Sequence, residues 1–162
     1  MADAIAESFY QTVNFHFNVG FKFPGGSDVD IRFQSVTGLD STLDTETIKE
    51  GGVNGFEHTL PVRRKYGPLT LKRGLLKPTD SKLTAWLKAA FDGIMVIPIK
   101  EVTINLLDEN HQPLMFWLIN NVWPRSWKIA ELNAERSEVL IETLELNYNR
   151  LIFSEKKAFN VK

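Results

Sequence analysis

The sequence predicts a mainly β protein of the α+β kind: a single β-barrel or sandwich domain with one packed α-helix and a long extended loop. Three observations lead to this fold class. Apolar and polar residues alternate without exception over Val13–Phe23, as in a half-buried strand. Only residues 79–93 combine helical spacing with capping residues. Residues 40–65 are polar and have no clear period. A barrel or sandwich with one helix is the simplest architecture that fits all three.

The composition is that of a soluble globular protein, and it excludes several classes of function. The 162 residues suit one domain over 1–162, with an N-terminal arm at 1–10 and a C-terminal tail at 154–162. Lys and Arg total 19 against 20 Asp and Glu, so no global charge attracts nucleic acid, and we expect no specific nucleic-acid partner. No cysteine is present, so disulfide frameworks are excluded.

The sequence contains neither a membrane span nor a recognisable secretion signal. No apolar stretch approaches the roughly 20 residues that a transmembrane helix needs. The first ten residues carry Asp3 and Glu7 and have no basic segment before an apolar run. We therefore expect cytoplasmic synthesis without a signal peptide and without a membrane anchor.

The first strand continues into a hairpin and then into the polar segment. A turn at Pro24–Ser27 precedes a second alternating segment, Val29–Phe33, and Gly38 ends or bends that strand. Residues 40–65, rich in Asp, Thr, Glu and Gly, are expected to leave the domain body as a long loop. Loops of this length usually carry function or gain order from a partner. A short strand then follows at Leu69–Lys72.

One helix is predicted over residues 79–93. Thr79 or Asp80 can cap its start, and Gly93 stands where a left-handed C-terminal stop belongs. The apolar residues recur at the spacing of one helical face, and they are Leu83, Trp86, Leu87, Ala90 and Phe91.

Strands are expected again in the second half. Val102–Leu106 alternates, Asp108–Asn110 forms a turn, and Leu114–Ile119 is an unbroken apolar run typical of a strand covered on both faces. The alternation of Val139–Thr143 changes phase at Leu144, which requires a bulge or two buried faces. A helix would also fit this last stretch, but the neighbouring strands and the sequence Asn-Tyr-Asn favour a strand.

The residues that could carry chemistry do not form a known motif. His16, His58 and His111 lack metal-ligand spacing, and solvated or interface histidines are the simpler interpretation. The glycine-rich Gly51–Gly55 matches no phosphate-binding loop. Carboxylates such as Glu138, Glu142 and Glu145 are plentiful, but no matched acid–base pair is evident. We predict no catalytic, metal or cofactor site, and a protein that is not an enzyme.

Two further groups of residues have competing interpretations. The basic residues Arg63–Lys65 and Lys72–Arg73 lack the basic surroundings of a nucleic-acid site and are expected to form a charged face or to pair with Asp44–Glu50. Tryptophans gather around Pro124, at positions 117, 123 and 127. They either pack at a strand corner or form part of an interface, where Trp is enriched.

Several short stretches, taken in order, resemble the inner tube proteins of contractile phage tails and of extracellular contractile injection systems. The resemblance covers nearly the whole chain. The matching stretches are Phe33–Leu39, Glu50–Asn54, Leu69–Gly74, Val122–Trp127, Leu132–Ala134 and Ile141–Tyr148.

This resemblance implies a structural subunit that assembles into six-membered rings, which stack into a hollow conduit within a phage-tail-like particle or virion tail. The implied partners are further copies of the chain and the sheath, baseplate or hub, and neighbouring tube proteins. The implied inter-subunit contact consists of Glu50, Gly51, Gly52, Asn54, Gly55 and His58. Three polar residues of the first strand are expected to line the lumen, and they are Asn14, Asn18 and Lys22.

Within the family, the sequence looks more like the baseplate-proximal tube initiator than like the repeating tube subunit. The resemblance is carried by Glu50–Asn54, by His58–Pro61 and by the Trp-Pro-x-x-Trp corner at Trp123. The alternatives are a monomeric small-ligand-binding β-barrel, which requires an apolar cavity, and an enzyme on a β scaffold, which requires a convergent set of catalytic groups.

Overall fold

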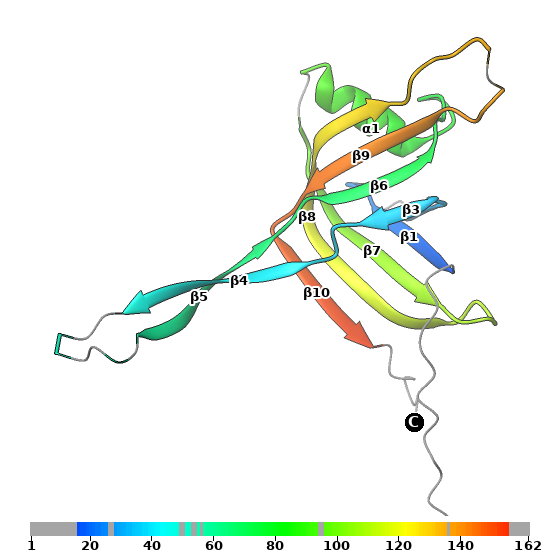
Figure 1. Ribbon diagram of the computed structural model, residues 1–162. Coiled ribbons are helices and arrows are strands. Elements are labelled where there is room, and N and C mark those ends of the chain that lie inside the picture. Colours follow the sequence, from blue (N-terminus) through cyan, green and yellow to red (C-terminus); the bar gives the residue numbers. More distant parts are fainter. Residues whose placement is uncertain are drawn as a thin grey trace, which may run out of the picture.

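The computed structural model describes residues 16–25, 28–48, 51–52, 55, 57–93, 96–135 and 137–155. The predicted N-terminal arm, residues 13–15 and the end of the predicted C-terminal tail lie outside this part of the chain. Ten strands and one helix are found in it (Figure 1). In chain order they are β1 (Phe17–Lys22), β2 (Asp28–Ile31), β3 (Ser35–Thr37), β4 (Ser41–Ile48), β5 (His58–Tyr66), β6 (Leu69–Gly74), α1 (Lys82–Phe91), β7 (Ile99–Leu107), β8 (Pro113–Ile129), β9 (Ile141–Asn147) and β10 (Arg150–Glu155).

Eight strands form one bent sheet, and the long strand β8 is its spine. The order is β2-β1-β7-β8-β9-β6-β3, and β10 pairs with β8 on the side away from β7. The first half of β8 pairs with β7 and β10, whereas its second half pairs with β9. The mainly β prediction is confirmed. Within the described residues the sheet does not close into a barrel, because β2, β3 and β10 each pair with a single strand and remain as open edges.

The core is built from one face of each strand. Val19 and Phe21 of β1 lie beside Ile104 and Val102 of β7, and all of them are buried. In the other half of the sheet, leucines of β6 and β9 pair in register as Leu69↔Leu146 and Leu71↔Leu144. Leu83 and Leu87 of α1 are buried in the same cluster. Alternation along the strands and helical spacing in α1 therefore converge on a single core.

The helix begins at a different cap from the one predicted. Ser81, not Thr79 or Asp80, is the N-cap residue, and its hydroxyl accepts a hydrogen bond from the Thr84 backbone N–H. Gly93 has a φ of +76°, as predicted for a left-handed stop. Phe91 is half exposed and stacks on Trp127 of β8, with ring centroids 6.4 Å apart. The apolar face of the helix thus packs on the second half of the spine strand.

Strand β9 resolves the ambiguous C-terminal pattern, and the helix alternative is wrong. Buried positions alternate through Glu142, Leu144 and Leu146, while the residues between them are half-buried. The bulge lies in the partner strand, where Pro124↔Leu146 is followed by Ser126↔Glu145, so that Arg125 is the extra residue. Strand β10 runs to Glu155, beyond the residue at which the tail was predicted to begin.

The spine strand is covered on both faces only in part, contrary to the prediction for the apolar run Leu114–Ile119. Ile119 is fully buried, but Leu114 is 37% exposed and the residues between them are half-buried. The pattern in the sequence did not distinguish a face packed in the core from a face that a single subunit leaves partly open.

A buried polar network joins three strands and the helix. The Arg73 guanidinium donates a hydrogen bond to the Glu142 carboxylate, and both side chains are almost completely buried. Arg73 Nη2 also donates to Thr84 Oγ1 at 2.6 Å and to Ser81 Oγ at 3.1 Å. Trp127 Nε1 donates to the other carboxylate oxygen of Glu142 at 2.7 Å. The sequence-based interpretation of Arg73 as part of a charged surface was therefore wrong.

The polar segment predicted as a loop is a two-stranded hairpin. Strands β4 and β5 pair antiparallel with each other and with no other strand in the described part of the chain. The hairpin, called here the arm (residues 41–66), projects away from the body (Figure 1). Nearly every residue of both strands is exposed. Because neither face is buried, no hydrophobic period marks these strands in the sequence.

The root of the arm is tightly constrained. Gly38, just after β3, has a φ of +89°, and a Cβ at this position would lie 2.1 Å from the Pro68 carbonyl oxygen. The Tyr148 hydroxyl donates a hydrogen bond of 3.3 Å to the Gly38 carbonyl oxygen. The Tyr66 and Tyr148 rings lie 5.4 Å apart. These contacts fix the direction in which the arm leaves the body.

Replacing Glu142 by Ala should lower the free energy of unfolding by about 3–5 kcal/mol, because the Arg73 charge would stay buried without its partner. Denaturant titration of the unassembled subunit measures this loss. The double variant Arg73→Met/Glu142→Leu should lose much less, since no buried charge remains. Equal losses in the two variants would show that the pair acts only through its volume.

Replacing Gly38 by Ala should destabilise the subunit by about 1–3 kcal/mol or more, because the added Cβ meets the Pro68 carbonyl in a left-handed backbone conformation. Gly25→Ala is the matched control, since Gly25 also has a positive φ, of +105°, but nothing lies within 4 Å of its Cβ position. The free energies of unfolding of the two variants are compared by thermal or denaturant unfolding. Their difference gives the cost of the contact between the added Cβ and the Pro68 carbonyl.

Tyr148 should ionise at a higher pH than an ordinary tyrosine. Burial, with smaller contributions from Asp40 and Tyr66, raises its pKa from 10.0 to about 12. The fold therefore favours the neutral phenol, and the stability that this preference contributes is lost as the pH rises from 10 through 12. Ultraviolet titration of tyrosinate should show a late-ionising group that is absent from Tyr148→Phe, and a normal titration would contradict the buried phenol.

Candidate subunit interface

The arm exposes large apolar side chains that the subunit itself cannot cover. Leu43, Ile48, Leu60 and Val62 are 45–58% exposed, and all four belong to β4 or β5. A two-stranded hairpin has no third layer against which to bury them, and it is marginally stable by itself in water. Apolar groups gathered on a projecting element mark a surface that binds a partner.

The register of the arm sorts its residues onto two faces. Leu43 pairs with Arg64 and Thr45 with Pro61, so that Val62 and Arg63 together lie opposite Asp44 in a bulge. Successive side chains of a strand point to opposite faces, and residues paired across the two strands point to the same face. Ile48, Leu60 and Arg63 therefore share one face of the arm, called here the Leu60 face. Lys65 and Asp44 lie on the same face, with Lys65 Nζ 2.6 Å from an Asp44 carboxylate oxygen. The Leu60 face thus combines exposed apolar residues with the basic Arg63 and with the exposed Glu46, which lies opposite Leu60.

Four of the six residues predicted from the sequence for this contact are described, and they lie toward the tip of the arm. Gly51 and Gly52 form a turn, and Gly52 has a φ of +98°. Gly55 is exposed, and His58 is the first residue of β5, opposite Ile48. Glu50 and Asn54 lie outside the described residues. The role of all six in subunit contact stays a prediction.

The sequence-based prediction missed the apolar side chains along the strands of the arm. A weak signal was present, since Leu60 and Val62 alternate with Thr59 and Pro61. The proline and the surrounding charges obscured this signal, because proline is rare inside strands.

The polar residues predicted to line a lumen lie on the outer face of the main sheet. Asn105 Nδ2 donates a hydrogen bond of 2.8 Å to Asn18 Oδ1, and Lys22 Nζ lies 4.0 Å from a Glu101 carboxylate oxygen. Asn14 is outside the described residues. The register continues this face across β7 onto β8, where Asn105 pairs with Phe116 and Thr103 with Leu118, while Glu101 pairs with Asn120. The face is therefore polar on β1 and β7 and mixed on β8.

The open edges of the sheet lie in strands other than the one suspected from the sequence. The sequence suggested that the first strand needs an external partner to cover its edge, but β1 lies between β2 and β7 within the subunit. Strand β2 pairs only with β1, and β10 pairs only with β8, among the described strands. Unpaired backbone N–H and C=O groups along such edges can bind strands of another chain.

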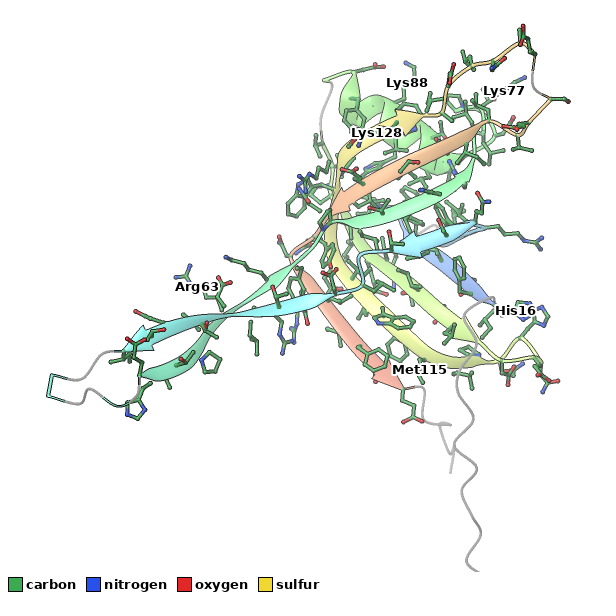
Figure 2. All side chains as sticks on the ribbon, viewed as in Figure 1. His16, Arg63, Lys77, Lys88, Met115 and Lys128 are labelled. Atoms are coloured by element: carbon green, nitrogen blue, oxygen red, sulfur yellow. The ribbon has the colours of Figure 1, made fainter. Side chains whose placement is uncertain are left out.

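The histidines do not form a metal centre in the described part of the chain. His16 and His111, far apart in the sequence, place their ring centroids 4.4 Å apart beside the end of β7, which the sequence pattern did not reveal (Figure 2). No three His, Asp or Glu side chains come close enough to hold a metal ion among the described residues. In the same residues, no helix is long and apolar enough to cross a membrane.

The tryptophans contribute mainly to packing. Trp127 and Trp117 pack against the buried core, and Trp117 contacts Phe153 of β10 with ring centroids 5.3 Å apart. Phe153 itself is 59% exposed, so the apolar surface continues beyond the core at the β10 edge. The core-packing interpretation thus fits these two residues, and Trp123 is half-buried at the start of the second half of β8.

Comparison with protein-family models gives a match over most of the chain. The model of the T4-like virus tail tube protein gp19 matches residues 13–152. Comparison with curated protein sequences gives no match.

Solved structures of tube and baseplate particles have the same fold. A chain of the six-fold symmetrised anti-feeding prophage baseplate is 31% identical with a TM-score of 0.82, covering 90% of this chain and 97% of that one. A chain of the extended sheath–tube complex of PVC, an extracellular contractile injection system, is 22% identical with a TM-score of 0.74, covering 92% and 95%. Hcp1 from Flavobacterium johnsoniae, 11% identical with a TM-score of 0.53, covers 86% and 95% and shows the fold alone. The extent of the family match and the similarity to the baseplate chain show that this protein belongs to the T4-like virus tail tube protein family.

Proposed function

We propose that this tail tube protein assembles into six-membered rings that stack into a hollow conduit at the baseplate end of a contractile injection particle. The observation that carries the proposal is the projecting arm. Its apolar side chains are exposed in the isolated subunit, and only a neighbouring chain can cover them. The role is mechanical and not enzymatic, since the tube guides and transmits force and any cargo passes through it.

Two of the open edges of the sheet, those of β2 and β10, support ring formation. A contact between the β10 edge of one subunit and the β2 edge of the next would be heterologous, and heterologous contacts generate a ring when their rotation closes. Such pairing would extend the sheet across subunits and remove both edges. The six-fold symmetry of the related baseplate structure supports a ring of six.

The polar face of β1 and β7 is suited to the lumen of the tube. Asn18, Asn105, Lys22 and Glu101 give it neutral and paired charged groups, with no excess of one sign. A passenger would find few apolar groups to adhere to there. Orientation of this face toward the axis is part of the proposal and follows from the predicted role of Asn14, Asn18 and Lys22.

The baseplate-proximal position is favoured over the repeating tube. Identity reaches 31% with the baseplate chain but 22% with the sheath–tube chain. The proposed partners are accordingly copies of the chain itself, neighbouring tube proteins, the sheath and the baseplate or hub. The ligand-binding monomer is not supported, because the family is that of tail tubes and the sheet is open.

Light scattering and negative-stain imaging test the proposal with a variant of the arm. Leu60→Asp should weaken ring formation about tenfold or more, because a charge would replace an apolar side chain at the contact. Thr59→Asp, on the opposite face of the same strand, is the matched control and should assemble nearly as the wild type. Circular dichroism should show both variants folded.

Wild-type rings with a central hole, lost in Leu60→Asp, would support the proposal. A wild-type protein that stays monomeric alone and with its baseplate proteins would contradict it. Rings that form equally well from Leu60→Asp would show that the arm is not the contact.

A further inference from the structure

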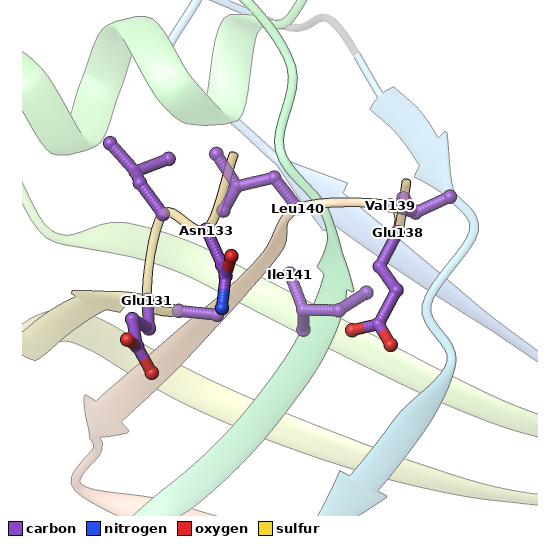
Figure 3. A pocket seen from close by; sticks show the side chains of 8 residues that line it. Glu131, Asn133, Glu138, Val139, Leu140 and Ile141 are labelled. Carbon is purple, nitrogen blue, oxygen red and sulfur yellow. The ribbon is translucent and has the colours of Figure 1, made fainter. Parts of the chain in front are cut away.

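The connection between β8 and β9 forms a pocket on the body of the subunit. The pocket has a volume of about 290 Å³ and is lined by Ala130–Asn133 and Glu138–Ile141. In Figure 3, Glu131 and Glu138 lie on opposite sides of Asn133 and Ile141, so the two carboxylates flank the pocket. It therefore has an acidic rim around a partly apolar floor.

This pocket contains the most exposed apolar side chains in the described part of the chain. Leu132 is 80% exposed and Val139 is 76% exposed. Glu131 and Glu138 are exposed, and neither forms an ion pair with any other described residue. Apolar surface next to unpaired carboxylates suits a partner that offers apolar groups and cations together.

The backbone holds the pocket in shape. Leu75 N–H donates a hydrogen bond of 2.8 Å to the Leu140 carbonyl oxygen, and Ala130 N–H donates one of 2.9 Å to the Ile141 carbonyl oxygen. Val139 Cγ1 would lie 3.3 Å from a Cβ at Gly74, so this side chain rests against β6. Both ends of the connection are therefore anchored to the sheet.

The arm has the chemistry that this pocket lacks. Arg63 and Arg64 are exposed, and neither forms an ion pair among the described residues. Ile48 and Leu60 lie with Arg63 on the Leu60 face, whereas Arg64, opposite Leu43, lies on the other face. Figure 2 places Arg63 midway along the arm, where no part of the body lies beside it. The Leu60 face thus offers exposed apolar groups and the unpaired Arg63 cation, and the pocket offers exposed apolar groups and unpaired carboxylates.

The two surfaces lie on opposite sides of the body. In Figure 1 the arm extends to one side from its root, whereas the β8–β9 connection lies at the far upper side, beyond β9 and α1. The fixed root prevents the arm from folding back across the body to its own pocket. A contact between these surfaces must join two copies, and repeating it from copy to copy gives a heterologous assembly that can close into a ring.

We propose that the arm of one subunit docks in the β8–β9 pocket of a second copy of the same chain. Ile48 and Leu60 of the Leu60 face cover Leu132 and Val139, and the guanidinium group of Arg63, on the same face, meets the carboxylates of Glu131 and Glu138. This inference rests on the proposed function, because it names the surface that receives the arm during assembly.

A charge exchange between the two surfaces tests the docking. Arg63→Glu and Glu131→Arg/Glu138→Arg should each weaken ring formation by about tenfold or more, since like charges would then face each other. The protein that carries all three substitutions should recover most of the wild-type assembly. Glu135→Arg is the matched control, because Glu135 lies in the same connection but does not line the pocket, and it should assemble normally. Sedimentation and negative-stain imaging count the rings.

Recovery in the triple variant supports the docking, because substitutions on two surfaces that do not meet would not compensate each other. If the arm variant loses its rings but the pocket variant keeps them, the arm docks elsewhere, and the docking is overturned while the proposed function stands. Loss in both variants without recovery in the triple variant also overturns the direct contact. Absence of rings from the wild type, with and without baseplate proteins, contradicts the proposed function itself.

Discussion

The buried ion pair between Arg73 and Glu142 holds the body in a single arrangement. Arg73 extends from β6 and reaches two hydroxyl groups at the start of α1, while Glu142 in β9 receives the indole N–H of Trp127 from β8. The guanidinium also lies 5.7 Å from the centre of the Phe33 ring. Burying two charges is costly unless every partner stands in place. A helix or strand displaced by one position would leave a charge unpaired, so the network discriminates against such alternatives.

The network is not completely satisfied. Arg73 Nη1 is buried and has no hydrogen-bond partner among the described residues. A buried donor without an acceptor costs about 1–3 kcal/mol. An apolar replacement of the whole network would avoid that cost but would lose the directional contacts that tie α1 to the sheet. The helix is also held by the buried Leu83 and Leu87, by stacking of Phe91 on Trp127, and by a hydrogen bond of 2.7 Å from Trp86 Nε1 to the Ile97 carbonyl oxygen.

The parts of the fold that could be predicted from the sequence are those with one buried and one open face. Strands β1, β6 and β7 and the face of α1 were identified because burial imposes a period on their residues. The arm has no buried face, so only backbone pairing defines it and the sequence carried no period. Arg73 lies two residues after the buried Leu71 in β6, and Glu142 lies two residues before the buried Leu144 in β9. Alternation along the strands therefore indicated that both charged side chains face the core. Alternation cannot reveal which distant charge will be the partner.

The candidate interface was predictable in location but not in its chemistry. Glycines in residues 51–55 marked a turn away from the body, and the resemblance to tail tubes gave that turn a role. The apolar side chains along β4 and β5 acquire meaning only from the register, which places Leu60 opposite Glu46 and Ile48 opposite His58. The register is set by hydrogen bonds between the two strands and not by the sequence of either strand alone. In the arm, the bulge opposite Asp44 shifts the pairing of β4 with β5 by one residue, and no pattern within one strand indicates this shift.

The rigid root of the arm has a consequence for the thermodynamics of association. The left-handed Gly38, its contact with Pro68 and the Tyr148 hydrogen bond set the direction of the arm when the chain folds. A flexible segment of the same length would lose its conformational entropy at the moment of binding, and the affinity would fall accordingly. Here much of that ordering is complete beforehand, so a partner subunit in the proposed ring would meet a surface that is already shaped. Addition of a subunit to that ring would then be limited mainly by encounter and desolvation, and not by ordering of the arm.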